Sequence, residues 1–298
     1  MKDKNLHGAW PALATPYTTG GAVNLTVLKE FVEYLVADKA VDGLYACGST
    51  AQGLFLSVAE RRAITEAVIQ QANGRLPVIV HIGSPVLADA ISLAKHAADC
   101  GADGISSVIP PLYTEDDAIV AYYQAVAGSV PELPFFPYFF NIEKDAVQLA
   151  ASLLHLPNLA GAKYTGPNLY ELKGLLDLRQ ERWTIFAGMD QQCAYAAMAG
   201  SPGNIGSTLN HFPGVYRAIH KSVAAGDLPG ALRCQEQANR ATRVMSKFGF
   251  FGAIWETLRW MGFEFGAPRL PAQGIPADKA PDFRTEMEQA GFWELVKM

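Results

Sequence analysis

Short apolar runs alternate with longer amphipathic stretches along the first three quarters of the chain. The runs are almost continuously apolar, which is typical of strands in a parallel sheet that is covered on both faces. This pattern predicts eight strands, at 8–16, 42–48, 77–83, 103–110, 133–140, 159–164, 183–188 and 203–207.

The amphipathic stretches between these runs have helical spacing, for example at 24–38, 57–73 and 87–100. Ser57 is placed to cap the second of them, and Glu60 completes a capping box. Strands that are each followed by a helix predict an α/β fold of the (β/α)8 TIM-barrel type. A doubly wound open sheet is the main alternative, but the turn "ATPYTTGG" lacks its usual GxGxxG pattern.

The strand pattern stops near residue 225, and helical patterns then continue to the end of the chain. We therefore expect a barrel over 1–225 and a C-terminal helical extension over 226–298. The aromatic stretch "WETLRWMGFEF" at 255–265 is interpreted as core or subunit contact and not as a cofactor site.

Composition narrows the functional class. Half of the 298 residues are hydrophobic, and the net charge of −5 is spread without runs of like charge. This predicts a sizeable core and no binding of nucleic acid or membrane surfaces. The absence of a long apolar segment predicts a cytoplasmic protein. No metal site is expected, because neither the histidines nor the cysteines have familiar ligand spacing; the cysteines are Cys47, Cys100, Cys193 and Cys234.

Lys163 is the most informative residue, because it lies in the apolar run "LAGAKY". A lysine is seldom buried without a reason. Its ammonium could reach water from a strand end, or its amine could be desolvated to act as a nucleophile. In a TIM barrel the chemistry lies at the carboxyl ends of the strands. Those ends carry "GST" at 48–50, Tyr113, Tyr138, "GMD" at 188–190 and "GSTLN" at 206–210.

This set of side chains suits imine chemistry. A neutral lysine can attack a keto carbon, a phenol can move protons, and hydroxyls after the second strand can hold a carboxylate. No cofactor is required, since the imine itself accepts electrons. Each feature also has a plainer structural interpretation: Tyr138 as a core residue, "GST" as a helix-entry turn, "GNIGST" as a phosphate cradle, and Asp190 as a helix N-cap.

From residue 8 to the C-terminal helices, the sequence resembles the N-acetylneuraminate lyase / dihydrodipicolinate synthase family of pyruvate-dependent class I aldolases. "GST" matches the motif that holds the keto-acid carboxylate, Tyr138 matches the tyrosine of Y-N-x-P, and Lys163 matches the Schiff-base lysine of G-x-K. "GNIGSTLN" matches G-x-I-G-S-T-x-N. The resemblance implies a homotetramer in which Tyr113 reaches a neighbouring subunit's site.

The resemblance assigns catalytic roles to Lys163, Tyr138, Ser49 and Tyr113. It assigns substrate binding to Gly48, Ser49, Thr50, Thr165, Gly188, Asp190, Gln191 and Ser207. The synthase branch commonly has an arginine shortly after the strand-five tyrosine, and "YFFNIEKDAV" has none. This favours the lyase branch.

Three departures from the family pattern surround the second-substrate side of the pocket. GSTGE becomes "GSTAQ", with Ala51 and Gln52; the stretch after Tyr138 is shortened; and Gln191 stands where the lyases have glutamate. We expect a lyase or aldolase that cleaves or forms a 2-keto-3-deoxy sugar acid, with pyruvate and an aldehyde as partners. The alternatives are a keto-deoxy sugar acid dehydratase, a synthase-like condensation, and a keto-acid binding or regulatory protein without activity.

Overall fold

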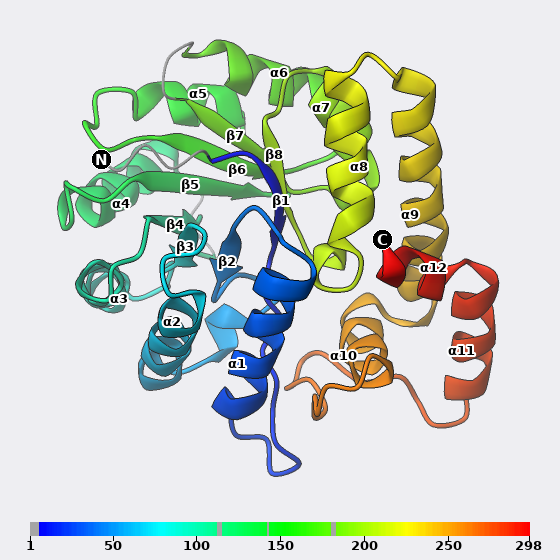
Figure 1. Cartoon of the computed structure of the whole chain (residues 1–298). Helices are drawn as coiled ribbons and strands as arrows, with labels where there is room; N and C mark the ends of the chain where they lie inside the picture. Colours follow the sequence, from blue (N-terminus) through cyan, green and yellow to red (C-terminus); the bar gives the residue numbers. More distant parts are fainter. Residues whose placement is uncertain (1–5, 112–114, 142, 180–182) are drawn as a thin grey trace.

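The computed structural model describes residues 6–111, 115–141, 143–179 and 183–298 (Figure 1). Each predicted apolar run forms a strand. The strands are β1 (Gly8–Pro11), β2 (Leu44–Ala46), β3 (Val78–His81), β4 (Gly104–Val108), β5 (Phe135–Phe140), β6 (Gly161–Thr165), β7 (Thr184–Ala187) and β8 (Gly203–Gly206).

The strands form one parallel sheet in the order β1-β8-β7-β6-β5-β4-β3-β2. A parallel bridge between Ala12 and Tyr45 connects β1 with β2, so the sheet is a nearly closed barrel and the prediction of the fold is confirmed. β1 is shorter than predicted. Beyond Pro11 the chain divides its backbone hydrogen bonds between two neighbours, because Ala12 donates to Gly206 and Leu13 donates to Tyr45.

A helix follows every strand and covers the outside of the barrel. These helices are α1 (Leu25–Glu33), α2 (Val58–Ala72), α3 (Leu87–Asp99), α4 (Asp116–Gly128), α5 (Ala146–Ser152), α6 (Leu169–Asp177), α7 (Cys193–Met198) and α8 (Pro213–Ala224). α1 continues into a π-helical turn over Tyr34–Asp38. The predicted capping box begins α2: the Ser57 side chain accepts from the Glu60 backbone, and the Glu60 carboxylate accepts from the Ser57 backbone.

The buried apolar side chains form two separate clusters. The larger lies between the strands and the surrounding helices. The smaller fills the inside of the barrel with Trp10, Ala12, Tyr45, Ile79, Phe136, Phe186 and Ile205. The ring centroids of Trp10 and Phe186 are 5.1 Å apart, and those of Phe136 and Phe186 are 5.9 Å apart. The barrel is therefore plugged by aromatic rings, as expected for a packed core.

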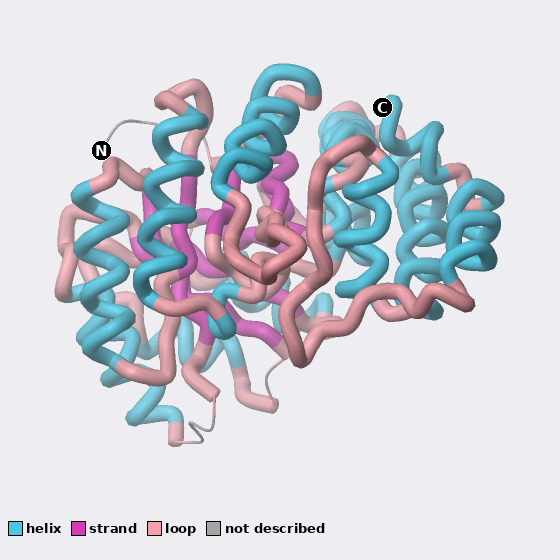
Figure 2. The backbone as a smooth tube through the Cα atoms, turned by 90° about the horizontal axis from the view of Figure 1, so that it is seen from below, coloured by secondary structure: helices cyan, strands magenta, loops and turns pink. Residues whose placement is uncertain are grey.

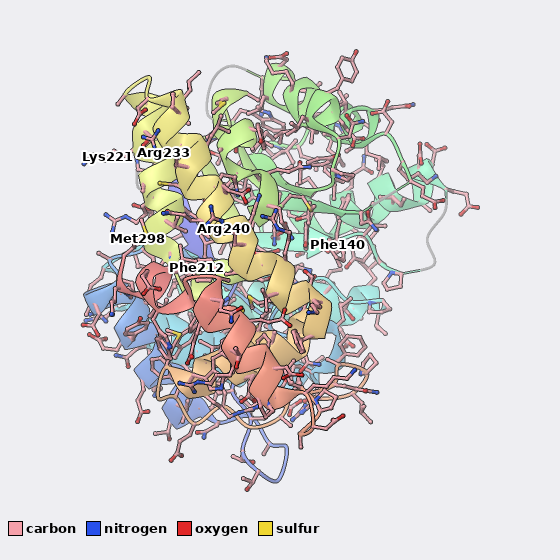
Figure 3. All side chains as sticks on the ribbon, turned by 90° about the vertical axis from the view of Figure 1, so that its right-hand side faces the viewer. Phe140, Phe212, Lys221, Arg233, Arg240 and Met298 are labelled. Carbon is pink, nitrogen blue, oxygen red and sulfur yellow. The ribbon has the colours of Figure 1, made fainter. Side chains whose placement is uncertain are left out.

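Four helices follow the barrel: α9 (Leu228–Phe248), α10 (Phe250–Trp260), α11 (Ala280–Gln289) and α12 (Phe292–Lys297). Figure 2 shows them beside the ring of barrel helices, and Figure 3 shows α11 and α12 with Met298 on this side of the molecule. Trp255 of α10 is fully buried, and its indole donates to the Thr15 carbonyl at 3.1 Å. The aromatic stretch at 255–265 thus contributes to the core. In the part of the chain that the structure describes, no helix is long and apolar enough to span a membrane.

Candidate active site

Lys163 points into the barrel because of its position in β6. Its strand neighbours Ala162 and Tyr164 belong to the outer cluster, between the sheet and the helices. Since successive side chains of a strand point to opposite faces, Lys163 faces the barrel axis. The register pairs it with Tyr138 on β5 and with Phe186 on β7.

The Lys163 amine is buried between two aromatic rings. The side chain is only 4% exposed, and Nζ lies 4.2 Å from the ring centroid of Tyr138 and 4.5 Å from that of Tyr45. Burial lowers its pKa from 10.5 to about 7, and the negative charge of Asp190 opposes this shift. A cation–π contact is worth about 0.5–2 kcal/mol, less than the hydration that the ammonium has lost. A large fraction of the amine is therefore neutral at physiological pH, in contrast to a lysine whose ammonium reaches water.

Tyr138 is buried beside the amine, and burial raises the pKa of its phenol to about 12. The hydroxyls of Thr165 and Ser49 act in the opposite direction and lower this pKa. Tyr138 is therefore protonated at neutral pH and can donate a proton to a group bound beside Lys163. Ser49, from the turn after β2, and Thr165, at the end of β6, thus both approach the Tyr138 hydroxyl, as the sequence predicted.

The turn after β2 meets the turn after β8 above β1, the strand that lies between them. The Thr50 hydroxyl lies 2.7 Å from the Ser207 hydroxyl, and either oxygen can donate. Gly48 and Thr50 are buried and Ser49 is half-buried. This places small hydroxyl-bearing residues from the two strands that flank β1 at the mouth, where they can hold a carboxylate without an arginine.

Asp190 holds a second pair of strand ends together. Its Oδ2 accepts from the Thr208 backbone at 2.9 Å and from the Thr208 hydroxyl at 2.7 Å. The interpretation of Asp190 as a helix N-cap is wrong, since its carboxylate bonds across to this neighbouring turn. The interpretation of "GNIGST" as a phosphate cradle is disfavoured as well. The backbone and hydroxyl donors of Thr208, at the end of this motif, already bind the Asp190 carboxylate. Asp190 Oδ1 is buried without a hydrogen-bond partner among the described residues.

Two glycines make this arrangement possible. A Cβ on Gly206 would lie 1.5 Å from Asp190 Oδ1, and one on Gly188 would lie 1.7 Å from Thr165 Oγ1. Both distances exclude any side chain without displacement of the polar group. The glycines of "GMD" and "GST" at 206–208 therefore allow Asp190 and Thr165 to sit close to the strand ends.

Gln52, which replaces the glutamate of the family motif, has a defined structural partner. Its side-chain amide donates to the Arg269 carbonyl at 2.6 Å and accepts from the Arg269 backbone at 2.9 Å. A glutamate could not donate to that carbonyl at neutral pH. Gln52 also has a left-handed backbone, with φ of 57°. The amide thus fixes the strained turn that carries Ser49 and Thr50.

The shortened stretch after Tyr138 places an apolar ring at the mouth. Phe140 is 45% exposed, and its ring centroid lies 5.6 Å from that of Tyr138. Asn141 follows with φ of 45°, and its backbone donates to the Thr165 carbonyl.

Sequence reasoning missed Tyr45 and His81. The Tyr45 hydroxyl contacts the Ser106 hydroxyl at 3.0 Å, and its ring faces the Lys163 amine. His81 Nδ1 lies 3.1 Å from the Cys47 carbonyl, and Nε2 accepts from the Val108 backbone at 3.0 Å. A carbonyl only accepts, so His81 is the neutral Nδ1–H tautomer. Burial, then Arg61, then Lys163 hold its pKa well below the usual value. Polar residues inside the second and third strands were the available signal.

For two predicted site residues, the described structure gives no side-chain contact within the site. Tyr113 lies outside the described residues, so its predicted role stays a prediction. The described contact of Gln191 belongs to its backbone: its carbonyl accepts from the Asn239 side chain of α9 at 3.1 Å.

Known proteins resemble this chain over nearly its whole length. A family model described as the dihydrodipicolinate synthetase family matches residues 5–290. N-acetylneuraminate lyase from Homo sapiens is 31% identical over 307 residues, covering 99% of this chain and 96% of the relative. The lyase from Xenopus tropicalis is 32% identical, covering 95% of this chain and 96% of its own length.

Solved structures agree. Proteus mirabilis N-acetylneuraminate lyase superposes with a TM-score of 0.91 at 28% identity, covering 96% of this chain and 99% of its own. The N-acetylneuraminate lyase (sialic acid aldolase) from Aliivibrio salmonicida also gives a TM-score of 0.91, at 26% identity. The match covers 97% of this chain and 98% of the lyase chain. The fold and nearly the whole length of the chain are therefore shared with these lyases.

The buried amine predicts a particular dependence of stability on pH. The unfolded chain keeps the Lys163 proton up to about pH 10.4, whereas the folded chain releases it near pH 7. Between these values the unfolded state binds more protons, so the free energy of unfolding rises with pH. Lys163→Met should raise the free energy of unfolding by a few kcal/mol at about pH 6, with a smaller gain at about pH 9.

Urea unfolding across this range measures the effect. Lys173→Met is the matched control, because Lys173 is exposed and paired with Asp177 on the surface of α6; this variant should keep the wild-type slope. A gain from Lys163→Met that does not change with pH would contradict the desolvation of the amine.

Proposed function

The chain belongs to the dihydrodipicolinate synthetase family, and from this premise we propose that it cleaves a 2-keto-3-deoxy sugar acid of the N-acetylneuraminate kind into pyruvate and an aldehyde sugar. It is a carbon–carbon lyase, a pyruvate-dependent class I aldolase of the Schiff-base type. The observation that carries the proposed roles is the buried Lys163 amine, which lies 4.2 Å from the Tyr138 ring and has a pKa of about 7.

In the first step the neutral Lys163 amine attacks the keto carbon of the substrate. The nitrogen forms a bond to carbon, the carbonyl π electrons move to oxygen, and the oxygen takes a proton to give a carbinolamine. Loss of this hydroxyl as water leaves a protonated imine. Tyr138 supplies the proton to the departing hydroxyl, since its phenol stays protonated at neutral pH.

In the second step the imine accepts the electrons of the breaking bond. The sugar hydroxyl next to that bond loses its proton and becomes the aldehyde carbonyl, while the C–C electron pair forms an enamine with the imine carbon. The enamine takes up a proton at carbon, and water then hydrolyses the imine to release pyruvate and the free amine. Tyr138, assisted by Ser49, is proposed to carry these protons.

The remaining site residues bind the two ends of the substrate. Ser49 and Thr50, with Gly48 for close backbone approach, are proposed to hold the carboxylate. The distal sugar chain is proposed to contact Thr165, Gly188, Asp190, Gln191 and Ser207. The buried Asp190 Oδ1, which has no hydrogen-bond partner among the described residues, supports this, because such an oxygen gains most from a substrate hydroxyl.

The lyase branch suits this chain better than the synthase branch. The sequence from 139 to 146 contains no arginine to bind a second acidic substrate. Instead the exposed Phe140 ring stands next to Tyr138. We propose that the shortened segment changes the choice of aldehyde and leaves the imine chemistry intact.

Assembly and organisation are part of the proposal. The family resemblance supports a homotetramer in which Tyr113 reaches a neighbouring site. From the sequence pattern we propose a cytoplasmic location, with residues 1–225 as the barrel and 226–298 as a helical extension.

Trapping the imine tests the central step. Incubation with pyruvate and cyanoborohydride should add one reduced pyruvate per chain, seen as an intact-mass shift that Lys163→Ala abolishes. The initial rate should rise as the pH is raised through about 7, because only the neutral amine attacks. Lys173→Ala, which keeps Lys163, should be trapped like the wild type. Failure of the folded wild-type chain to form the adduct would sink the assignment of Lys163.

Tyr138→Phe tests the proton carrier. The substitution keeps the ring and removes the hydroxyl, so kcat for cleavage should fall by about 10²–10⁴-fold, while binding of pyruvate changes much less. Tyr45→Phe is the matched control, since Tyr45 is as buried and as close to the amine but its hydroxyl faces Ser106. Equal losses in both variants would assign Tyr138 a packing role only.

Product analysis tests the reaction class. With N-acetylneuraminate and other 2-keto-3-deoxy sugar acids as substrates, the expected products are pyruvate and an equimolar aldehyde sugar, measured by mass spectrometry. A product lighter than the substrate by one water would instead identify a dehydratase working through the same imine.

A further inference from the structure

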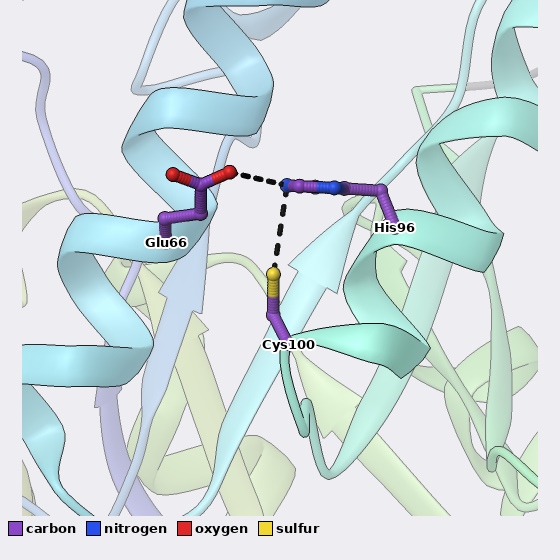
Figure 4. Close-up of side chains that lie close together, drawn as sticks. All are labelled: Glu66, His96 and Cys100. Atoms are coloured by element: carbon purple, nitrogen blue, oxygen red, sulfur yellow. Dashed lines mark hydrogen bonds and ion pairs between the residues drawn. The ribbon is translucent and has the colours of Figure 1, made fainter.

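Glu66, His96 and Cys100 come together on the outside of the barrel (Figure 4). Glu66 lies on α2, His96 lies in the last turn of α3, and Cys100 directly follows that helix, one turn further along. His96 Nε2 is 3.2 Å from a Glu66 carboxylate oxygen and 3.5 Å from the Cys100 sulfur. One ligand-type atom from each residue lies within 4.8 Å of the other two.

A thiol, an imidazole and a carboxylate could also form a nucleophilic relay, but the geometry excludes one here. A relay needs the histidine to face the nucleophile with one ring nitrogen and the carboxylate with the other. In this cluster both contacts fall on the same nitrogen, as the two dashed lines in Figure 4 show. A single ring nitrogen carries either one lone pair or one proton. It therefore cannot accept a proton from the thiol while it also donates one to the carboxylate.

Donors that converge on a common point are typical of a metal site. Zinc takes sulfur at about 2.3 Å and imidazole nitrogen at about 2.0–2.1 Å, and a tetrahedral angle then separates these two atoms by about 3.5 Å. The nitrogen–sulfur separation of 3.5 Å matches this edge. We propose that Glu66, His96 and Cys100 bind a zinc ion, with water in the fourth position.

The mixed donor set favours zinc over the harder cations. Magnesium and calcium prefer oxygen ligands, whereas zinc accepts sulfur, nitrogen and oxygen together. The Glu66 side chain is half exposed, so the open position faces solvent. Burial, then the charges of Glu66 and Asp99, raise the pKa of the Cys100 thiol, so metal binding releases its proton.

The site is separate from the barrel mouth. Cys100 directly follows α3, where the chain turns toward the start of β4, whereas Lys163 and its partners lie at the opposite ends of the strands. A bound ion would connect α2 and α3 and would stabilise the folded chain without entering the reaction. This proposal departs from the expectation of no metal site, which rested on familiar ligand spacings and did not weigh His96 and Cys100 as an i, i+4 pair.

Titration of the metal-free full chain with Zn²⁺ and with Co²⁺ tests the site. We expect one Zn²⁺ retained per chain after gel filtration, and a Co²⁺ complex with tetrahedral visible bands and a thiolate charge-transfer band. Cys100→Ser should remove the charge-transfer band. The zinc affinity of this variant should also fall. The loss should exceed roughly 10–100-fold, which is the usual effect of mutating a residue that hydrogen-bonds to a metal ligand without binding the metal itself.

Cys234→Ser is the matched control, because Cys234 is also partly buried but lies on α9; its spectrum and affinity should match the wild type. His96→Gln and Glu66→Gln should weaken zinc binding with unchanged melting temperatures in the metal-free state. Equal zinc affinity in the wild type and Cys100→Ser, or no retained zinc in the wild type, would overturn the site.

Discussion

The removal of water from one amine organises the centre of this barrel. Lys163 lies between the rings of Tyr138 and Tyr45 with only 4% of its surface exposed, and the desolvated ammonium gives up its proton near neutral pH. One of these rings, Tyr45, also belongs to the apolar cluster that fills the barrel. Packing and reactivity are therefore linked at this residue, because repacking the interior around Tyr45 would alter the surroundings of the nucleophile.

The polar groups around the amine come from strand ends that must be held at fixed separations. Asp190 connects the turn after β7 with the turn after β8, and Thr50 meets Ser207 above β1. These contacts depend on glycines that leave room for buried oxygens. The mouth is thus preorganised by short hydrogen bonds between turns, and Asp190 also adds a negative charge that opposes the full neutralisation of Lys163.

Much of this could be predicted from the sequence because the signals were local. Apolar runs located the strands, the Ser57 capping box located the start of α2, and strand-end positions selected Lys163 and Tyr138. The Tyr45 ring over the amine was missed, since a strand that is apolar on both faces does not reveal which residues point inward. The predicted end of the first strand was too late, because the backbone hydrogen bonds pass from β8 to β2 just after Ala12. The meeting of Glu66 with His96 depends on how two helices pack.

The pairing of Gln52 with Arg269 joins positions 217 residues apart. The turn that carries Ser49 and Thr50 lies near the start of the chain. The backbone of Arg269, which holds this turn through Gln52, comes after all eight strands in the sequence. During synthesis on the ribosome, the eight strands can emerge and associate while this turn still lacks its partner. Completion of the carboxylate-binding side of the mouth is therefore a late event, tied to the arrival of the segment that follows α10 and not to closure of the sheet.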